Sequence, residues 1–329
     1  MSDYPTFNRQ TKRWENVDFN KAAGHKGKVL KTSYNKKDVL LFANATGAQK
    51  DELHLLYELH PNFATLPTFP CNLAFKKTHQ DVIDFIKESG AGPIPGVPPF
   101  DPQRTVDGER SIEIVNTIPT SSEGLDLEIH PEIVGVYDKG GNMIMESKQT
   151  LLDAKTGTVY ARLTGMGFGM KQGGYGGPRG PAEPPYPKPL QAQPDAIHRY
   201  QTTPETALLY RLCGDYNPMH ADDGFGQRAG FKQHILQGLG TWNIAAHGLL
   251  RELGKANPEN FVRFKARFKA VVYPGDLLET RMWKTGKREG DVDEIIFETV
   301  ATSPGEKPRV VLTKGLAGIR TGGRGVSKL

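Results

Sequence analysis

The chain has 329 residues, of which 37% are hydrophobic and 24% charged, so it can build packed cores for about two domains of ordinary size. Its formal net charge of +5 is modest, and neither zinc-finger spacing nor a dense Lys/Arg stripe points to nucleic acid. Its two cysteines lie far apart, which excludes a disulfide framework, and no apolar run approaches the ~20 residues that span a membrane.

The first half of the chain places helix patterns before strand patterns. Apolar residues at helical spacing predict helices over 36–45 and 81–88. Four strands are expected after them, over 110–118, 127–137, 143–152 and 158–165. Helices followed by an antiparallel meander are typical of an α+β unit. We therefore expect residues 1–164 to form one α+β domain.

A segment rich in glycine and then in proline separates the two halves. It covers residues 165–194 and lacks apolar periodicity. Such a composition is typical of a linker that is partly extended where the prolines cluster. The linker divides the chain into halves of similar size, and the second domain is expected over 195–320.

The second half opens with a helix signal. Thr202 or Thr203 can serve as the N-cap, and Pro204 suits the first turn. Glu205 completes a capping-box pattern with Thr202, so the side chain of Glu205 is expected to cap the first turn of the helix. Gly214 is a fitting residue for the end of this helix. The pattern therefore predicts a short helix just before a polar loop.

A second helix is predicted over 238–253, where apolar residues form a broad stripe. Four strands are expected after it, over 264–272, 277–284, 294–302 and 310–319. The order of helix and then meander thus occurs in both halves, which indicates two copies of one α+β unit. The alternative is two unrelated α+β halves, because the repeat is weak at the level of single residues.

The polar loop holds the residues best suited to chemistry. Asp215 and His220 are five residues apart, so on one helix their side chains would point about 140° apart. Asn217 followed by Pro218 argues against a continuous helix, and a tight loop can bring both side chains together. A carboxylate and an imidazole can orient a water molecule and transfer a proton near neutral pH. The alternative is an ordinary turn in which His220 makes a structural hydrogen bond.

The sequence around this loop resembles a known enzyme family. GDYNPMH (214–220) resembles the hydratase 2 signature of the MaoC-like (R)-specific enoyl-CoA hydratases. The resemblance extends over about residues 15–320. Further matching segments are LQGLGT (236–241), ARFKAVVYPGDLLET (266–280), Tyr57-Glu58 and LPTFP (66–70).

The resemblance implies a double hot-dog fold, in which two antiparallel sheets each wrap around a central helix. Residues 195–320 would form the catalytic hot-dog, with the helix from Gly238 at its centre. Residues 1–164 would form a hot-dog that lacks its own catalytic loop and binds a long acyl chain. The resemblance also implies a homodimer, or two hot-dogs paired within one chain.

The resemblance also implies roles for single residues. Asp215 and His220 would act on water, and Asn217 would keep the loop in shape. Gly238 is expected to begin a helix, so its backbone N–H can stabilise a developing oxyanion. Substrate contacts are implied for Asp107, Gly108, Lys139 and Phe268, although Lys139 in a YDKGGN turn is equally consistent with a solvated hairpin tip.

Two charged residues and one departure from the family complete the expected site. Glu58 and Arg211 correspond to charged positions in related sequences, and we expect an interdomain ion pair that orients the loop; the alternative is two separate surface charges. Gln237 stands where the family often has His before Gly238. Gln can still donate and accept hydrogen bonds, so the reaction class is expected to hold while the oxyanion geometry can differ.

The expected function is therefore an (R)-specific 2-enoyl-CoA hydratase, or a (3R)-3-hydroxyacyl-CoA dehydratase, of fatty acid β-oxidation. CoA is part of the substrate, and neither a further cofactor nor a metal is expected. Two alternatives are a hot-dog acyl-CoA thioesterase and a non-catalytic acyl-CoA-binding protein. The intact Asp-x-Asn-Pro-x-His pattern favours hydration over both.

The chain ends with Ser327-Lys328-Leu329, which is the tripeptide read by the peroxisomal import receptor. The preceding residues from 321 are rich in glycine and basic, so the tail over 321–329 is expected to be exposed. Three specified residues at one specified place rarely occur by chance. The sequence thus predicts a peroxisomal location with the import receptor as a partner.

Overall fold

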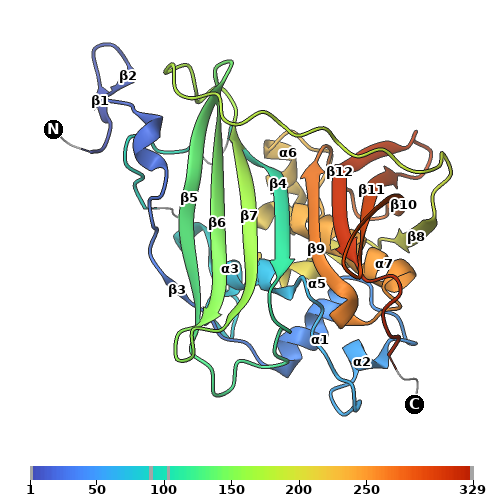
Figure 1. The fold of residues 1–329 in the computed structure, drawn as a ribbon. Coiled ribbons are helices and arrows are strands. Elements are labelled where there is room, and N and C mark those ends of the chain that lie inside the picture. Colours follow the sequence, from blue (N-terminus) through green and yellow to red (C-terminus); the bar gives the residue numbers. More distant parts are fainter. Residues whose placement is uncertain (1–2, 89–91, 102–103, 327–329) are drawn as a thin grey trace.

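The computed structural model describes residues 3–88, 92–101 and 104–326, and its main feature is one antiparallel sheet of ten strands (Figure 1). The first half contributes β3 (Leu30–Lys31), β5 (Leu127–Lys139), β6 (Asn142–Asp153), β7 (Val159–Gly169) and β4 (Thr105–Ile114), in that spatial order. The second half continues with β9 (Phe261–Phe268), β12 (Arg309–Ile319), β11 (Val292–Thr302), β10 (Leu277–Glu289) and β8 (Ala196–Gln201).

The two half-sheets are joined edge to edge through β4 and β9. The pairing is antiparallel and runs from Glu109 opposite Arg267 to Glu113 opposite Arg263. The two sheets expected from the sequence are therefore continuous. This pairing satisfies the backbone groups of two strands that would otherwise be exposed sheet edges.

The helices lie on one side of this sheet. The longest is α7 (Gly238–Leu253), whose residues 239–250 are buried, and it packs against β8, β9, β10 and β12. The first half has the shorter α1 (Lys36–Ala45), which begins with a capping box between Asn35 and Asp38. The other helices are α2 (Leu53–Leu56), α3 (Leu73–Lys76), α4 (Phe85–Glu88), α5 (Thr206–Arg211) and α6 (Asp223–Arg228).

Short elements complete the fold. In the described ranges the 3-10 helices are η1 (Phe19–Ala22), η2 (Phe69–Asn72), η4 (Pro218–His220) and η5 (Pro258–Asn260). A separate hairpin near the N-terminus pairs β1 (Thr6–Asn8) with β2 (Arg13–Glu15). None of the helices in the described ranges is both long and apolar enough to cross a membrane.

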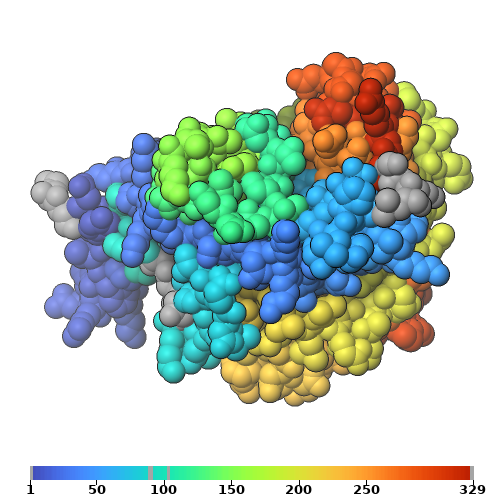
Figure 2. Space-filling model, turned by 90° about the horizontal axis from the view of Figure 1, so that it is seen from below, coloured from blue at the N-terminus to red at the C-terminus, as the bar shows by residue number. Residues whose placement is uncertain are grey.

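One apolar core spans both halves. Phe42 of α1 contacts the rings of Phe69 and Tyr210, with ring centroids 5.4 and 6.4 Å apart. In the second half Phe264 packs against Trp242 and Phe297, each at 4.6 Å between centroids. Seen from below, the blue segments of the first half lie directly beside the yellow segment that begins the second half (Figure 2). The halves thus share their interior.

The structure confirms the two longer predicted helices, 36–45 and 238–253, and the eight predicted strands with shifted ends. The predicted helix over 81–88 is reduced to α4. Strand β7 continues to Gly169, so the start of the predicted linker belongs to the sheet. Strand β8, which pairs with β10 just before the first helix of the second half, was not expected from the sequence.

The predicted capping box of that helix is wrong. Helix α5 begins at Thr206, and its N-cap Glu205 makes no side-chain capping hydrogen bond. Thr202 is buried and its Oγ1 donates to the carbonyl of Asp276 at 2.7 Å, so it anchors the end of β8 instead. Thr203 Oγ1 accepts from the backbone N–H of Glu205 at 3.2 Å. Asp276 competes with the helix for the Thr202 side chain. Because Asp276 lies 74 residues away in sequence, no local pattern reveals this contact.

Candidate active site

The loop between α5 and α6 brings Asp215 and His220 together. Asn217 caps η4, because its Oδ1 accepts from the N–H of Met219 at 3.1 Å. Asp215 Oδ1 accepts from the N–H of Asn217 at 3.3 Å. The other oxygen, Oδ2, lies 3.8 Å from His220 Nε2. The predicted loop is therefore present, and Asn217 shapes it as expected.

A hydrogen bond to a backbone carbonyl fixes the orientation of the His220 ring. Its Nδ1 lies 2.9 Å from the carbonyl oxygen of Ile235. A carbonyl oxygen can only accept, so Nδ1 carries the proton, and in the neutral ring Nε2 has a free lone pair. The 3.8 Å gap to Asp215 is too long for a direct hydrogen bond but allows one water molecule to bond to both groups.

Burial sets the charge states of the pair. The side chains of His220 and Asp215 are only 8% and 13% exposed. Burial lowers the pKa of His220, against the opposing effect of the nearby Asp215 carboxylate. Burial also raises the pKa of Asp215, against the opposing effect of His220. Both shifts favour the neutral forms, which suits groups that exchange a proton with a bound reactant.

Gly238 is the first residue of α7, the helix that follows α6 along the chain. The N-cap residue Gln237 makes no side-chain capping hydrogen bond; its buried amide instead donates to the carbonyl of Ala207 at 3.3 Å. The helix N-terminus thus keeps backbone N–H groups that a ligand oxygen can use. A Cβ atom at Gly238 would lie 3.3 Å from the Phe268 ring, so glycine keeps this approach open.

A pocket of about 460 Å³ gathers the four predicted substrate contacts, and we call it the Lys139 pocket. Asp107, Gly108, Lys139 and Phe268 all line it, although they come from three strands in both halves. Its lining also includes Lys265 and Arg267. Because Phe268 also lies against Gly238, this pocket reaches the start of α7.

A second pocket of about 480 Å³ adjoins the same loop from the side of the first half, and we call it the apolar pocket. It is lined by Gly214 and Leu239, which directly precede Asp215 and follow Gly238. Much of the remaining wall is apolar, including Phe75, Ile83 and Leu163. Both pockets are lined mainly by the first half, and each approaches the catalytic candidates through second-half residues, Phe268 beside Gly238 and Gly214 before Asp215.

The predicted ion pair between Glu58 and Arg211 is wrong. In the described part of the chain Glu58 is exposed and has no ion-pair partner, while Arg211 lies over the Tyr216 ring at 5.4 Å. Arg211 is nevertheless close to the loop, since its charge contributes to lowering the pKa of Asp215 against the larger effect of burial.

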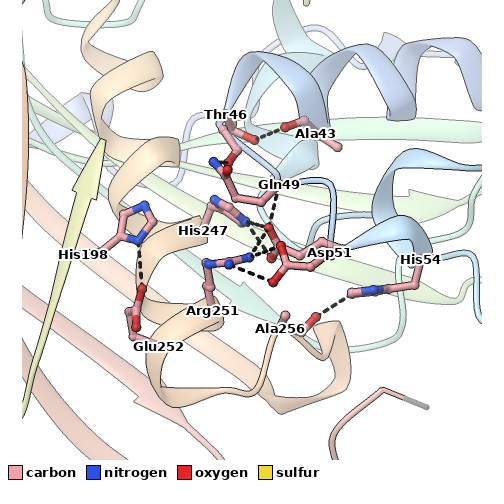
Figure 3. Close-up of polar contacts among 12 residues, drawn as sticks. Ala43, Thr46, Gln49, Asp51, His54, His198, His247, Arg251, Glu252 and Ala256 are labelled. Atoms are coloured by element: carbon pink, nitrogen blue, oxygen red, sulfur yellow. Dashed lines mark hydrogen bonds and ion pairs between the residues drawn. The ribbon is translucent and has the colours of Figure 1, made fainter. Parts of the chain in front are cut away.

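A different ion cluster links the two halves (Figure 3). Glu52, in the first half, lies 3.0 Å from His247 Nε2 and 2.8 Å from Arg251, both on α7. Arg251 also pairs with Asp51 at 2.9 Å. Glu52 and His247 are almost completely buried. Acidic residues 51 and 52 precede a short helix, but nothing in the local sequence indicates that they face α7.

A hydrogen-bonded chain that the sequence did not reveal supports the loop. The hydroxyl of Tyr210, in α5, donates to Asn72 Oδ1 at 3.0 Å and accepts from Asn243 Nδ2 at 2.8 Å. All three groups are buried. Because Asn72 belongs to the first half and Asn243 to α7, this chain fixes the helix that carries the loop from both sides.

Arg110 is a further site residue that sequence reasoning missed. It lines the apolar pocket, and its Nε donates to Asp107 Oδ1 at 2.9 Å. Residues three apart on a regular strand point to opposite faces. A bulge in β4 between Asp107 and Glu109 brings the two side chains to the same side. The glycine in VDGER was the only local sign of such an irregularity.

No group of three or more His, Cys, Asp or Glu side chains in the described ranges is arranged to hold a metal ion. The tripeptide Ser327-Lys328-Leu329 lies outside the described residues.

Family models match both halves of the chain. The family model of the MaoC like domain matches residues 186–304, and that of the MFE-2 hydratase 2 N-terminal domain matches residues 32–166. A protein of Mycobacterium tuberculosis with a double hot-dog fold superposes with a TM-score of 0.53 over 89% of this chain and 95% of that one. At 14% identity this likeness concerns the fold alone, and it confirms the predicted fold class.

Closer relatives match nearly the whole chain. The probable dehydratase NIT22 of Ajellomyces capsulatus is 38% identical over 311 residues, which cover 90% of this chain and 81% of the relative. The probable enoyl-CoA hydratase 2 of Dictyostelium discoideum is 34% identical over 302 residues, covering 92% and 96%. The crystal structure of a MaoC-like dehydratase from Phytophthora capsici superposes with a TM-score of 0.80 at 29% identity, covering 92% and 98%. The chain therefore belongs to the MaoC-like hydratase 2 family.

Proposed function

We propose that the protein adds water across the double bond of 2-enoyl-CoA thioesters to give (3R)-3-hydroxyacyl-CoA, and removes it in the reverse direction. The observation that carries this proposal is the Asp215–His220 pair, held 3.8 Å apart at the start of α7 and between two pockets. Membership of the hydratase 2 family supports it, because relatives named enoyl-CoA hydratase 2 match the chain over almost its full length.

The geometry supplies each part of the hydration step. Water bound between Asp215 and His220 gives a proton to the pair, and its oxygen forms a bond to carbon 3 of the substrate. The electrons of the double bond move towards the thioester oxygen, which the free N–H of Gly238 stabilises. The pair then returns one proton to carbon 2. The free lone pair on His220 Nε2 makes it the first acceptor of the water proton.

The two pockets suit the two ends of such a substrate. The Lys139 pocket offers the ammonium group of Lys139, which suits the phosphate-bearing CoA moiety, while Lys265 and Arg267 in the same lining are paired with Glu109 and Glu183. The apolar pocket suits the acyl chain. With both ends held, water reaches carbon 3 from one side only, and this gives a single enantiomer.

The test is a spectrophotometric hydration assay with crotonyl-CoA and 2-decenoyl-CoA, in which the product is coupled to dehydrogenases specific for each enantiomer. We expect the (3R) product. Predominant (3S) product would contradict the hydratase 2 assignment even if hydration were fast. Release of free CoA without hydration would favour the thioesterase alternative, and tight binding without either reaction would favour an acyl-CoA-binding protein.

Peroxisomal location belongs to this proposal as well. It rests on the terminal Ser327-Lys328-Leu329, and a fluorescently tagged chain lacking these three residues is expected to stay in the cytosol while the purified variant keeps full activity. The homodimer expected from the family remains a prediction, which sedimentation analysis of the purified chain can check.

A further inference from the structure

Arg110 is an unusual residue in the wall of the apolar pocket. It lies on β4 and faces a pocket whose other walls are largely apolar. Gly165, on the paired strand β7, lies next to Arg110. A Cβ atom at Gly165 would come within 2.5 Å of Nη1 of Arg110. Glycine at this position thus leaves room for a guanidinium group on the pocket side of the sheet.

The Asp107 carboxylate neutralises the charge of Arg110, but several N–H groups of Arg110 have no hydrogen-bond acceptor in the described ranges. Nε donates to Asp107, and Nη2 lies 2.9 Å from the same carboxylate. Burial lowers the pKa of Arg110, but the Asp107 carboxylate outweighs this and raises it overall, so the guanidinium stays charged. Among the residues that the structure describes, Nη1 has no acceptor. A guanidinium has five N–H groups, so several remain available.

The position of this pair links the two pockets. Asp107 lines the Lys139 pocket and Arg110 lines the apolar pocket, so the ion pair lies between the linings of the two pockets. Asp107 is also close enough to Asp215 to contribute to its raised pKa, after the larger effect of burial. A substrate with its thioester at Gly238 therefore has the first carbons of its acyl chain near Arg110.

A purely aliphatic chain matches the apolar walls of this pocket but not the part of the wall that Arg110 forms. It would cover the unused N–H donors of Arg110 without offering an acceptor, and buried donors without partners are costly. Ser111 and Gln149 add further polar groups to the same lining. Because Asp107 already neutralises Arg110, the remaining donors suit a neutral oxygen better than a second carboxylate.

We propose that Arg110 determines specificity for acyl groups that carry a neutral oxygen acceptor, such as a keto or hydroxyl group, in the part of the chain beyond carbon 3. This inference rests on the proposed function only for the placement of the acyl chain in the apolar pocket. The acceptor takes the free N–H groups of Arg110, while Asp107 holds the guanidinium in place.

Binding of unreactive saturated thioesters tests this directly. We would titrate the full-length protein with octanoyl-CoA and with octanoyl-CoA analogues that carry a ketone at carbon 5, 6 or 7, using calorimetry. At least one keto analogue is expected to bind roughly tenfold or more tightly than octanoyl-CoA, as for a hydrogen bond to a charged donor. Equal or weaker binding of all three analogues would overturn the proposal.

Variants identify the residue responsible. In Arg110→Leu the preference for the keto analogue is expected to disappear, and octanoyl-CoA is expected to bind at least as well as before. The double variant Asp107→Asn/Arg110→Leu removes the carboxylate that the single variant leaves unpaired, and must show the same loss. Arg162→Leu is the matched control, since Arg162 forms an exposed ion pair with Glu113 on the neighbouring strand and lines neither pocket. A preference that survives in both Arg110 variants would assign it to another residue.

Hydration rates separate this inference from the proposed function. The corresponding 2-enoyl-CoA substrates, with and without the ketone, are assayed in parallel with the binding experiment. If neither is hydrated, the proposed function fails, while the calorimetric preference and its loss in the Arg110 variants still decide the inference. If only the aliphatic substrate is hydrated, the function stands and the inference is wrong.

Discussion

Burial sets the charge states of Asp215 and His220, and one backbone hydrogen bond orients the His220 ring. The carbonyl of Ile235 fixes the tautomer of His220, and the loop around Asn217 fixes the carboxylate. Both side chains are largely removed from solvent, so each is more easily neutral than in water. The protons of such a pair belong to both groups together, and titration of the site reports on the pair.

Replacing either residue is expected to reduce turnover without loss of the fold. Asp215→Asn or His220→Ala removes a group that contacts the attacking water, and kcat should fall by about 10²–10⁴-fold. Crotonyl-CoA hydration measures the rate, and thermal unfolding checks the fold. The control is Asp223→Asn, which alters an exposed carboxylate paired with His234 at 2.6 Å and should keep normal activity. Near-normal hydration by a folded Asp215 or His220 variant would show that the site is wrongly assigned.

The pH profile of hydration follows from the shift in His220. His220 accepts the water proton only when it is neutral, so kcat/KM should rise with pH as His220 loses its proton. Because burial lowers its pKa, the midpoint should lie below the ordinary histidine value of about 6.5. The Asp215 carboxylate opposes this shift, so the residual activity of Asp215→Asn should have a still lower midpoint. A midpoint above the ordinary value would contradict this assignment of the base.

At the scale of elements, helix α7 is positioned by close backbone contacts rather than by its polar end groups. Its N-cap Gln237 provides no capping hydrogen bond, and most of its residues are buried. Gly248 lets strand β8 approach, because a Cβ atom there would lie 2.6 Å from Cδ2 of His198. His198 cannot easily move aside, since its Nδ1 is paired with Glu252 at 3.1 Å. Small residues thus set the distance between helix and sheet.

Gly248→Ala tests this packing. Alanine is better than glycine in a helix by about 1 kcal/mol, but overpacking a tight contact costs about 1–3 kcal/mol. We expect the steric cost to exceed the gain in helix propensity, so the free energy of unfolding measured with urea should fall by about 1 kcal/mol. The control Gly322→Ala has no atom within 4 Å of the added methyl group and should change stability little. Stabilisation by Gly248→Ala would show that α7 and β8 can move apart freely.

At the scale of the whole molecule, the two halves form one folding unit. They share the continuous sheet across β4 and β9, the apolar core and the ion cluster at Glu52. Burial tends to raise the pKa of Glu52, but its contacts with His247 and Arg251 outweigh this and lower it overall. The buried carboxylate is therefore charged and stabilising only while these partners from α7 are in place.

Glu52→Gln is expected to destabilise the whole chain by about 3 kcal/mol, the usual cost of breaking a buried pair. Because the pKa of Glu52 is lowered on folding, its contribution is present above the ordinary glutamate value and is lost as the pH falls through the lowered value. The stability difference from the wild-type chain should therefore shrink in acid. Asp51→Asn is the matched control, since it alters the more exposed partner of Arg251 and should cost at most about 1 kcal/mol. A stability difference between Glu52→Gln and the wild-type chain that stays constant at all pH values would show that Glu52 is not charged in the folded protein.

Features that depend on neighbours in the chain could be predicted from the sequence. The loop that brings Asp215 and His220 together could be predicted because both lie with Asn217 within six residues and Pro218 excludes a continuous helix. The helix over 238–253 and the eight predicted strands followed from periodicity, which reflects the burial of one face. The substrate contacts Asp107, Gly108, Lys139 and Phe268 were expected from the family resemblance alone, and the structure places all four in one pocket.

Contacts between residues far apart in the chain could not be predicted, because they depend on how the whole chain packs. Glu58 and Arg211 failed as an ion pair, and Glu52 with His247 replaced them across 195 residues, because charges far apart in sequence carry no local sign of their partner. The bulge that turns Asp107 towards Arg110 depends on the pairing of β4 with β7. The joining of two half-sheets through β4 and β9 likewise depends on two edges meeting in space. Local periodicity specifies which face is buried, but the packing of the whole chain selects what buries it.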